Sequence, residues 1–118
     1  MRNLKTAIAI LGVGTILVAA PMLSFADDDA KQNYQTFCIK CHGPEGKGNG
    51  PAAAPLAKKP RDFTDCAYMK TRTDDQLFNV IQNGGKANGL SPDMQAWKQA
   101  FDKNDINGLI GYIRNFCK

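Results

Sequence analysis

The pentapeptide Cys38-Ile39-Lys40-Cys41-His42 constrains this chain more than any other feature of its sequence. Two thiols three positions apart lie on one helical turn, where each can add to a vinyl group of a haem, and an imidazole directly after the second thiol can reach the iron. His42 is also the only histidine in the 118 residues. The motif therefore predicts one covalently bound haem c, with Cys38 and Cys41 as thioether attachments and His42 as an axial ligand of the iron.

Two other uses of a Cys-x-x-Cys pair compete with this interpretation. A structural zinc site needs two further ligands at matching spacing, whereas the remaining cysteines, Cys66 and Cys117, stand far from the pair and from each other. A thioredoxin-like redox pair follows a β-strand, but residues 31–37, just before the motif, have the pattern of a helix. Both alternatives fit the surrounding sequence less well than a haem site does.

The N-terminus has the parts of a secretory signal peptide. Arg2 and Lys5 make its start positive, residues 7–20 are uncharged and mostly apolar, and Ser24-Phe25-Ala26 places small residues at the positions that a signal peptidase recognises. We expect cleavage after residue 26 and export to the periplasm, with residues 27–118 forming a single domain. The alternative is an uncleaved anchor that keeps the domain facing the periplasm, because the apolar run is almost long enough to span a bilayer.

Cleavage would leave 92 of the 118 residues. A domain of that size buries a limited core, so a haem at its centre would supply much of the missing apolar surface. Two of the 15 basic residues precede the cleavage point, so 13 basic residues face 11 acidic ones, and two haem propionates would bring the net charge close to zero. This balance gives no indication of nucleic-acid binding.

Cys66 and Cys117 are left over once the haem motif is assigned. In an exported protein they meet an oxidising environment, where two remaining cysteines most economically form one disulfide. By the chain-entropy estimate, closing a loop of this length stabilises the fold by about 4 kcal/mol. The alternatives are two free buried thiols, or a pair that senses or transfers redox state.

Helical patterns dominate the remainder of the chain. Acidic residues 27–29 suit the start of a helix whose apolar face, including Tyr34 and Phe37, leads to the haem motif. A capping box predicts a helix over 73–83, which Gly84-Gly85 ends, and Asp102 precedes an apolar stripe that ends at residue 117. Four helical segments and no convincing strand predict an all-α fold, with four short helices wrapped around one haem.

Residues 43–64 are rich in glycine and proline, which excludes a long helix and suits a loop that bends around a cofactor. We expect this loop to form a wall of the haem pocket and to offer a backbone carbonyl to the iron-bound imidazole, with Pro51 as the candidate. Arg61 can donate hydrogen bonds to a haem propionate, although a solvated charge beside Lys58 and Lys59 explains it nearly as well.

The sixth position of the iron decides what the haem does. A thioether there favours the ferrous state and closes the site, which gives an electron carrier, whereas an empty position permits ligand binding or peroxide chemistry. The domain contains two methionines, Met69 and Met94. Met94 lies in a loop far from His42 and is the favoured ligand. Met69 is the weaker candidate because it also suits ordinary core packing, and a site without methionine is the third possibility.

Several motifs along the chain together resemble those of bacterial class I monohaem cytochromes c. They are Tyr34, Cys38-x-x-Cys41-His42-Gly43, Gly50-Pro51, Pro60-Arg61-Asp62-Phe63, the helix from Thr73 to Phe78, Gly84-Gly85, Met94-x-x-Trp97 and Tyr112-Ile113-Arg114. The similarity covers nearly all of residues 27–118. It implies that Met94 binds the iron, that the Pro51 carbonyl supports the imidazole, and that Trp97 lies at the cofactor.

The same resemblance implies that Phe37 and Tyr112 pack together where the first and last helices cross. The chain departs from the family in two respects. The ligand methionine is often followed by proline in the family, whereas Gln95 stands here, which is expected to loosen the loop and lower the reduction potential somewhat. The pair formed by Cys66 and Cys117 is not general in the family.

These features predict a periplasmic electron carrier, a monomer that exchanges one electron at a time with redox protein donors and acceptors. We expect no enzymatic activity and no small-molecule substrate, because the sole histidine would be bound to iron. The near-neutral charge gives no reason to expect a nucleic-acid partner. Two alternatives remain: a haem subunit of a periplasmic dehydrogenase or respiratory complex, and a small haem peroxidase or gas sensor with an open iron. Five lysines either surround the haem edge and steer acidic partners or are scattered surface charges. They are Lys47, Lys58, Lys59, Lys70 and Lys86.

Overall fold

The computed structural model describes residues 25–118, and the predicted signal peptide lies almost entirely outside this range. The described chain is helical and contains no β-strand, which confirms the all-α prediction. The elements are α1 (Phe25–Asn33), a π-helical turn (Tyr34–Cys38), α2 (Ile39–His42), α3 (Cys66–Lys70), α4 (Asp74–Ala87), α5 (Lys103–Arg114) and a 3₁₀ turn (Asn115–Cys117). Within residues 25–118, none of the helices has both the length and the apolar character needed to cross a membrane.

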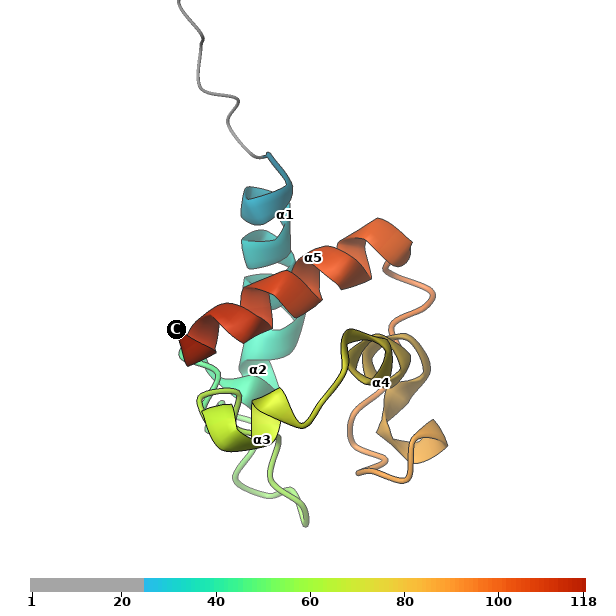
Figure 1. The fold of residues 1–118 in the computed structure, drawn as a ribbon. Helices are drawn as coiled ribbons and strands as arrows, with labels where there is room; N and C mark the ends of the chain where they lie inside the picture. Colours follow the sequence, from blue (N-terminus) through green and yellow to red (C-terminus); the bar gives the residue numbers. More distant parts are fainter. Residues whose placement is uncertain (1–24) are drawn as a thin grey trace, which may run out of the picture.

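Helix α1, the π-helical turn and α2 form one continuous rod that α5 crosses, as Figure 1 shows. Asp27 and Asp28 lie in the first turn of α1, where negative charge is favoured by the helix dipole. In the π-helical turn the N–H of Ile39 donates to the carbonyl of Tyr34, five residues earlier. Such turns insert an extra residue into a helix and often occur at functional sites. Here the turn ends at Cys38, the first residue of the haem-binding motif.

Tyr34, the first residue of the π-helical turn, packs where the rod and α5 cross. This side chain is 1% exposed, and its ring centroid lies 5.1 Å from that of Tyr112. The predicted contact between Phe37 and Tyr112 is wrong, because Phe37 is 41% exposed and packs edge-on against Trp97 and Phe101 instead. The wider π-helical turn places Tyr34, rather than Phe37, on the face that meets α5.

The hydrophobic core lies at this crossing and extends under α3. Helix α5 contributes the apolar stripe that its sequence predicts, α3 contributes Met69, and the loop before α3 contributes Phe63. The buried members of this core are Tyr34, Phe63, Met69, Phe101, Ile106, Leu109, Ile110 and Ile113. The core therefore supports the C-terminal end of the rod, where α2 carries the haem motif.

Helix α4 begins as predicted and ends differently. Thr73 accepts a hydrogen bond from the N–H of Gln76, and the Gln76 side chain accepts from the N–H of Thr73, which completes a capping box. The helix extends to Ala87, beyond the predicted end at residue 83, but Gly84 interrupts it with φ 81° and ψ 168°. Since few residues other than glycine adopt this conformation, the predicted stop is present as a break inside α4.

Asp102 caps α5. Its carboxylate accepts hydrogen bonds from the N–H groups of Asn104 at 2.7 Å and Asp105 at 3.0 Å. We expect Asp102→Ala to lower the free energy of unfolding by about 1–2 kcal/mol, measured by denaturant titration, because two N–H donors lose their partner. Asn107→Ala, on the exposed side of the same helix, is the control and is expected to stay within about 0.5 kcal/mol of the parent. Equal losses in the two variants would contradict the capping role.

The loop over residues 43–64 folds back along the end of α2. Gly48 donates its N–H to the carbonyl of His42 at 2.8 Å, and Gly50 donates to that of Cys41 at 3.0 Å. These bonds satisfy carbonyls that every helix end leaves without a partner. A side chain at Gly50 would collide with the carbonyl of Lys40, so glycine is needed for this close approach. The loop thereby surrounds the haem-binding motif, as its composition predicts.

Candidate functional site

The two thiols of the motif lie three residues apart on the rod. Both are partly buried, and neither is paired with another cysteine. Burial raises the pKa of Cys38 to about 11, and the neighbouring Cys41 adds to the effect. A thioredoxin-like pair depends on a thiol whose pKa is lowered, so this environment does not suit one. A zinc site is not completed either, because Cys66 and Cys117 are joined to each other, with Cα atoms 5.3 Å apart.

The imidazole of His42 is held on two sides. Its Nδ1 lies 3.2 Å from the carbonyl oxygen of Arg61, and its ring stacks on that of Phe63 with centroids 4.5 Å apart and planes 14° from parallel. When Nδ1 carries the donated hydrogen, Nε2 carries the lone pair that a metal requires. Burial lowers the pKa of His42, and the hydrogen bond to Arg61 partly opposes this. The neutral, metal-binding form of the imidazole is therefore favoured.

The predicted support from Pro51 is wrong in this structure. Pro51 is exposed, and its neighbours in the loop are tied by hydrogen bonds to the carbonyl end of α2. The N–H groups of Gly50 and Ala52, on either side of Pro51, donate to the carbonyls of Cys41 and Lys40. The same loop passes the imidazole ten residues later, where the carbonyl of Arg61 meets Nδ1. The loop thus supplies a carbonyl, as expected, but from a different residue.

A buried hydrogen bond that the sequence did not indicate holds the backbone just after His42. The hydroxyl of Tyr34 donates to the carbonyl of Gly43 at 2.7 Å. Gly43 has φ 79°, so the chain turns sharply there. Burial, followed by smaller effects of Cys38 and Tyr112, raises the pKa of Tyr34 well above its usual value, so its hydroxyl stays protonated and remains a donor. Tyr34 therefore joins the helix crossing to the haem-binding motif.

The two methionines have different environments. Met69 is 2% exposed and belongs to the core, which agrees with core packing rather than ligation. Met94 is only partly buried and lies in the loop before α5, where its carbonyl accepts the N–H of Gly85 at 2.8 Å. Its own N–H donates to the carbonyl of Ser91 at 3.3 Å. The break in α4 thus anchors the backbone of the methionine that sequence analysis selected.

This anchor predicts a specific effect of a small substitution. In Gly85→Ala the added Cβ would collide with the carbonyl of Ser91 and lie 3.2 Å from the Cβ of Met94. We expect the loop to shift, and the near-infrared absorption band of a thioether–ferric iron bond to weaken or disappear. Gly111→Ala is the control, because a Cβ there meets open space. An undiminished band in Gly85→Ala would show that the backbone at this position does not place Met94.

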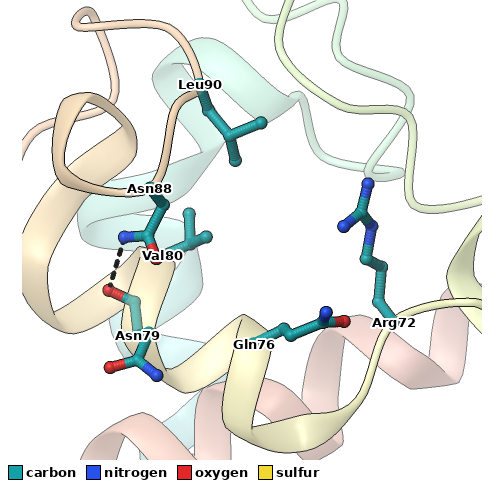
Figure 2. Close-up of a pocket in the computed structure, with 6 residues that line it drawn as sticks. All are labelled: Arg72, Gln76, Asn79, Val80, Asn88 and Leu90. Carbon is teal, nitrogen blue, oxygen red and sulfur yellow. Dashed lines mark hydrogen bonds between the residues drawn. The ribbon is translucent and has the colours of Figure 1, made fainter.

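Arg61 does not have the side-chain environment expected of a propionate partner. Its guanidinium lies 3.7 Å from the ring centroid of Tyr68 on the exposed surface. Arg72 differs, because its Nε is buried and has no hydrogen-bond partner in the described chain. Figure 2 shows its guanidinium extending into a cavity of about 180 Å³. The other lining residues are Gln76, Asn79, Val80, Asn88 and Leu90.

Arg72 is half-buried, and its guanidinium lies over the ring of Tyr68 at 4.7 Å from the centroid, so it is the Nε alone that is buried without a partner. A buried donor of this kind is compensated best by an anion or another acceptor, which makes Arg72 a candidate that sequence analysis missed. The signal available in the sequence was its position one residue before the capping threonine of α4. The two thiols, the oriented imidazole and the anchored methionine form a donor set that fits a covalently attached haem, whereas none of these residues lines the cavity beside Arg72.

The remaining candidate residues are one half-buried tryptophan that packs against the core and five lysines. Trp97 donates its backbone N–H to the carbonyl of Ile81 at 3.0 Å, and its ring contacts those of Phe37 and Phe101. The five predicted lysines are all exposed. Lys47 pairs with Glu45 at 2.6 Å, which lowers the pKa of the carboxyl and raises that of the lysine. This ion pair leaves Lys47 less available than an unpaired lysine to a protein partner.

Comparison with known proteins identifies the class of protein to which this chain belongs. A solved structure described as the KustC0563 c-type cytochrome superposes with a TM-score of 0.61, at 22% sequence identity, over 76% of this chain and 99% of that one. This likeness shows the fold of a c-type cytochrome, the class of protein that holds haem c covalently through thioether bonds to cysteine. Residues 25–113 match the family described as cytochrome c oxidase, cbb3-type, subunit III, and the chain belongs to this family of cytochrome c domains.

A curated relative is named thiosulfate dehydrogenase electron acceptor, from Stutzerimonas stutzeri (strain A1501). It is 32% identical over 76 residues, which make up 64% of this chain and 23% of the relative. The chain therefore spans about a quarter of the length of this curated relative.

Proposed function

We propose that this protein is an exported electron carrier that transfers one electron at a time through a haem attached to Cys38 and Cys41, with His42 and Met94 as axial ligands. The carrying observation is that the imidazole of His42 is already oriented by a carbonyl on Nδ1, while Met94 is anchored in a separate loop. A bound haem supplies reversible one-electron chemistry of its iron. The order of the ligands along the chain also supports the class I arrangement.

The protein's own residues keep the geometry constant between the two oxidation states. Arg61 and Phe63 hold the imidazole, Tyr34 holds the backbone behind it, and Gly85 holds the loop of the methionine. Ligands that are fixed in this way need little rearrangement on electron transfer, and the packed aromatic side chains exclude water from the metal. We propose this mechanism for the domain: the haem would supply the change of oxidation state, and the protein residues would keep its ligands in place.

The proposed location is the periplasm, with residues 1–26 as the signal peptide. Two features support an oxidising compartment: the composition of the N-terminus and the paired sulfur atoms of Cys66 and Cys117. We propose that these cysteines form a structural disulfide there. The family membership agrees with export.

The proposed partners are redox proteins that donate and accept electrons. The relative named as an electron acceptor of thiosulfate dehydrogenase supports a donor of the oxidoreductase class. The partial coverage of that relative also favours a second candidate function, a haem domain that serves as the electron-accepting part of a larger complex. Stable co-purification with a large catalytic subunit would favour this second function, whereas a freely diffusing monomer would favour the carrier.

Arg72 provides a further prediction. We propose that its guanidinium, rather than that of Arg61, binds a haem propionate. Arg72→Gln should lower the reduction potential by tens of millivolts, because removing a partly buried positive charge favours the ferric state. It should also make the potential more dependent on pH. Arg61→Gln is the matched control, since both guanidinium groups lie over the ring of Tyr68 but Arg61 is exposed, whereas Arg72 has a buried Nε without a partner. Equal shifts in the two variants would contradict the assignment to Arg72.

The visible spectrum of the reduced protein, before and after carbon monoxide is added, tests the proposed function directly. An unchanged spectrum means that a strong sixth ligand closes the iron, which is the result expected of a carrier. Rapid and complete binding of carbon monoxide would mean an open iron, and would replace the carrier with a peroxidase or a gas sensor.

A further inference from the structure

One short loop segment, from Arg61 to Cys66, makes two contacts with the imidazole of His42. Its first residue offers a carbonyl to Nδ1 at 3.2 Å, and Phe63 stacks on the imidazole ring with centroids 4.5 Å apart. Its last residue is joined to Cys117, near the C-terminal end of the chain. The segment that orients the imidazole is therefore anchored at one end to a residue 51 positions further along the chain.

Phe63 is also held on its other side. Its ring lies nearly parallel to that of Phe116, with planes 13° apart and centroids separated by 6.5 Å. Its N–H donates to the carbonyl of Gly46 at 2.7 Å, and its own carbonyl oxygen lies 3.2 Å from the Sγ of Cys117. A side chain at Gly46 would approach the ring of Phe116 to 2.7 Å, so this ring is seated directly on the glycine backbone. The C-terminal turn therefore closes over Phe63.

We infer that Phe63 is a positioning residue for the iron-binding imidazole, and that the pairing of Cys66 with Cys117 keeps it in place. We call this set, completed by Phe116, the histidine brace. The contacts to the imidazole of His42 come from the carbonyl of Arg61 and from the ring of Phe63. Neither cysteine sulfur contributes to these contacts. The inference rests on the proposed function in one respect, namely that His42 binds iron.

The physical reason is the position of the C-terminal turn. The last residues of a chain fray readily unless they are tied down. The link between Cys117 and Cys66 restrains the turn that carries Phe116, and this ring covers Phe63. Without the link, Phe63 would have more freedom to leave the imidazole of His42, and the hydrogen on Nδ1 would be exposed to water more often.

The test measures the exchange rate of the Nδ1 hydrogen of His42 with solvent by NMR, in the diamagnetic ferrous protein. Two samples of the unaltered protein are held ferrous at an electrode, and one is treated with dithiothreitol. This reagent passes two electrons to the disulfide, Cys66 and Cys117 each gain a proton as thiols, and dithiothreitol becomes its cyclic disulfide. We expect exchange to be at least tenfold faster in the treated sample, with the iron ligands retained.

Two variants separate positioning from general loosening. Phe116→Leu keeps an apolar side chain but removes the ring that covers Phe63, so exchange should accelerate without any reductant. Asp102→Ala weakens α5 at its opposite end and should leave the exchange rate within twofold of the parent. Acceleration in the reduced sample and in Phe116→Leu, but not in Asp102→Ala, is the expected pattern.

Unchanged exchange after complete reduction, verified by counting thiols with mass spectrometry, would overturn the inference. Equal acceleration in Asp102→Ala would also overturn it, because the effect would then be a general loss of stability. Failure of the proposed function would appear earlier, since the untreated protein would lack the spectrum of a histidine-bound iron. The two failures are therefore distinguishable in the same experiment.

Discussion

Replacing Met94 with alanine is expected to open the sixth position of the iron, so that the reduced variant binds carbon monoxide rapidly whereas the parent does not. The ferric variant should also lose the thioether–iron absorption band. Its reduction potential should fall by about 0.1–0.3 V, a part of the roughly 0.8 V range that axial ligands control. The reason is that a thioether favours the ferrous state, whereas water or hydroxide in its place favours the ferric state.

Met69→Leu is the matched control for this experiment. Met69 is buried in the core, so leucine should keep the spectrum and the closed iron while changing the free energy of unfolding by less than about 1.5 kcal/mol. If Met94→Ala left the spectrum and the potential unchanged, the sixth ligand would have to come from another residue. If Met69→Leu opened the iron, the assignment of the two methionines would be reversed.

Removing the link between Cys66 and Cys117 is expected to lower the free energy of unfolding by about 4 kcal/mol, because a cross-link over 51 positions restricts the unfolded chain. The double variant Cys66→Ala and Cys117→Ala should show this loss in denaturant unfolding of the oxidised protein. It is a large fraction of the total stability of a small domain, which is commonly about 5–15 kcal/mol.

The reductant provides the control for this second prediction. Dithiothreitol should destabilise the parent by a similar amount and have no further effect on the double variant. A parent protein whose unfolding is insensitive to dithiothreitol, although its thiols become titratable, would contradict a stabilising disulfide. A single variant, Cys117→Ala, should lose nearly as much as the double variant, because either change breaks the same bond.

The helical elements were predictable because their signals are local. The capping residues Thr73 and Asp102 make the hydrogen bonds expected of them, and the stop at Gly84 is present as a break within α4. Each of these features depends on residues within a few positions along the chain. The composition of residues 43–64 likewise excluded a long helix, and the structure contains turns there. Interactions of short range therefore account for the outline of the fold.

The contacts of the imidazole were not predictable in the same way. A glycine- and proline-rich loop was expected to offer a carbonyl to His42, but many residues of the loop have one. The hydrogen bonds between the loop and the end of α2 decide that Arg61, and not Pro51, faces Nδ1. The stacking of Phe63 on the imidazole depends on the same path of the loop. These contacts follow from tertiary packing.

The π-helical turn and the burial of side chains account for the other differences between prediction and structure. The π-helical turn begins at Tyr34, which meets Tyr112, whereas Phe37 lies inside the turn, is 41% exposed and packs against Trp97 and Phe101. A regular helical repeat applied to the sequence does not include such an extra residue. Similarly, two arginines carry equal charge in the sequence and both lie over Tyr68, and only the tertiary structure shows that the Nε of Arg72 is buried without a partner.

The sequence by itself determined the haem-binding motif, the all-α character and the starts of α4 and α5, because covalent motifs and helix caps involve residues that are close along the chain. Only the tertiary structure decided which carbonyl orients His42, which aromatic ring stacks on it and which arginine has a buried Nε without a partner. Those choices depend on contacts between residues such as His42, Phe63 and Phe116, which are far apart in sequence and meet only when the loop, α2 and the C-terminal turn pack together.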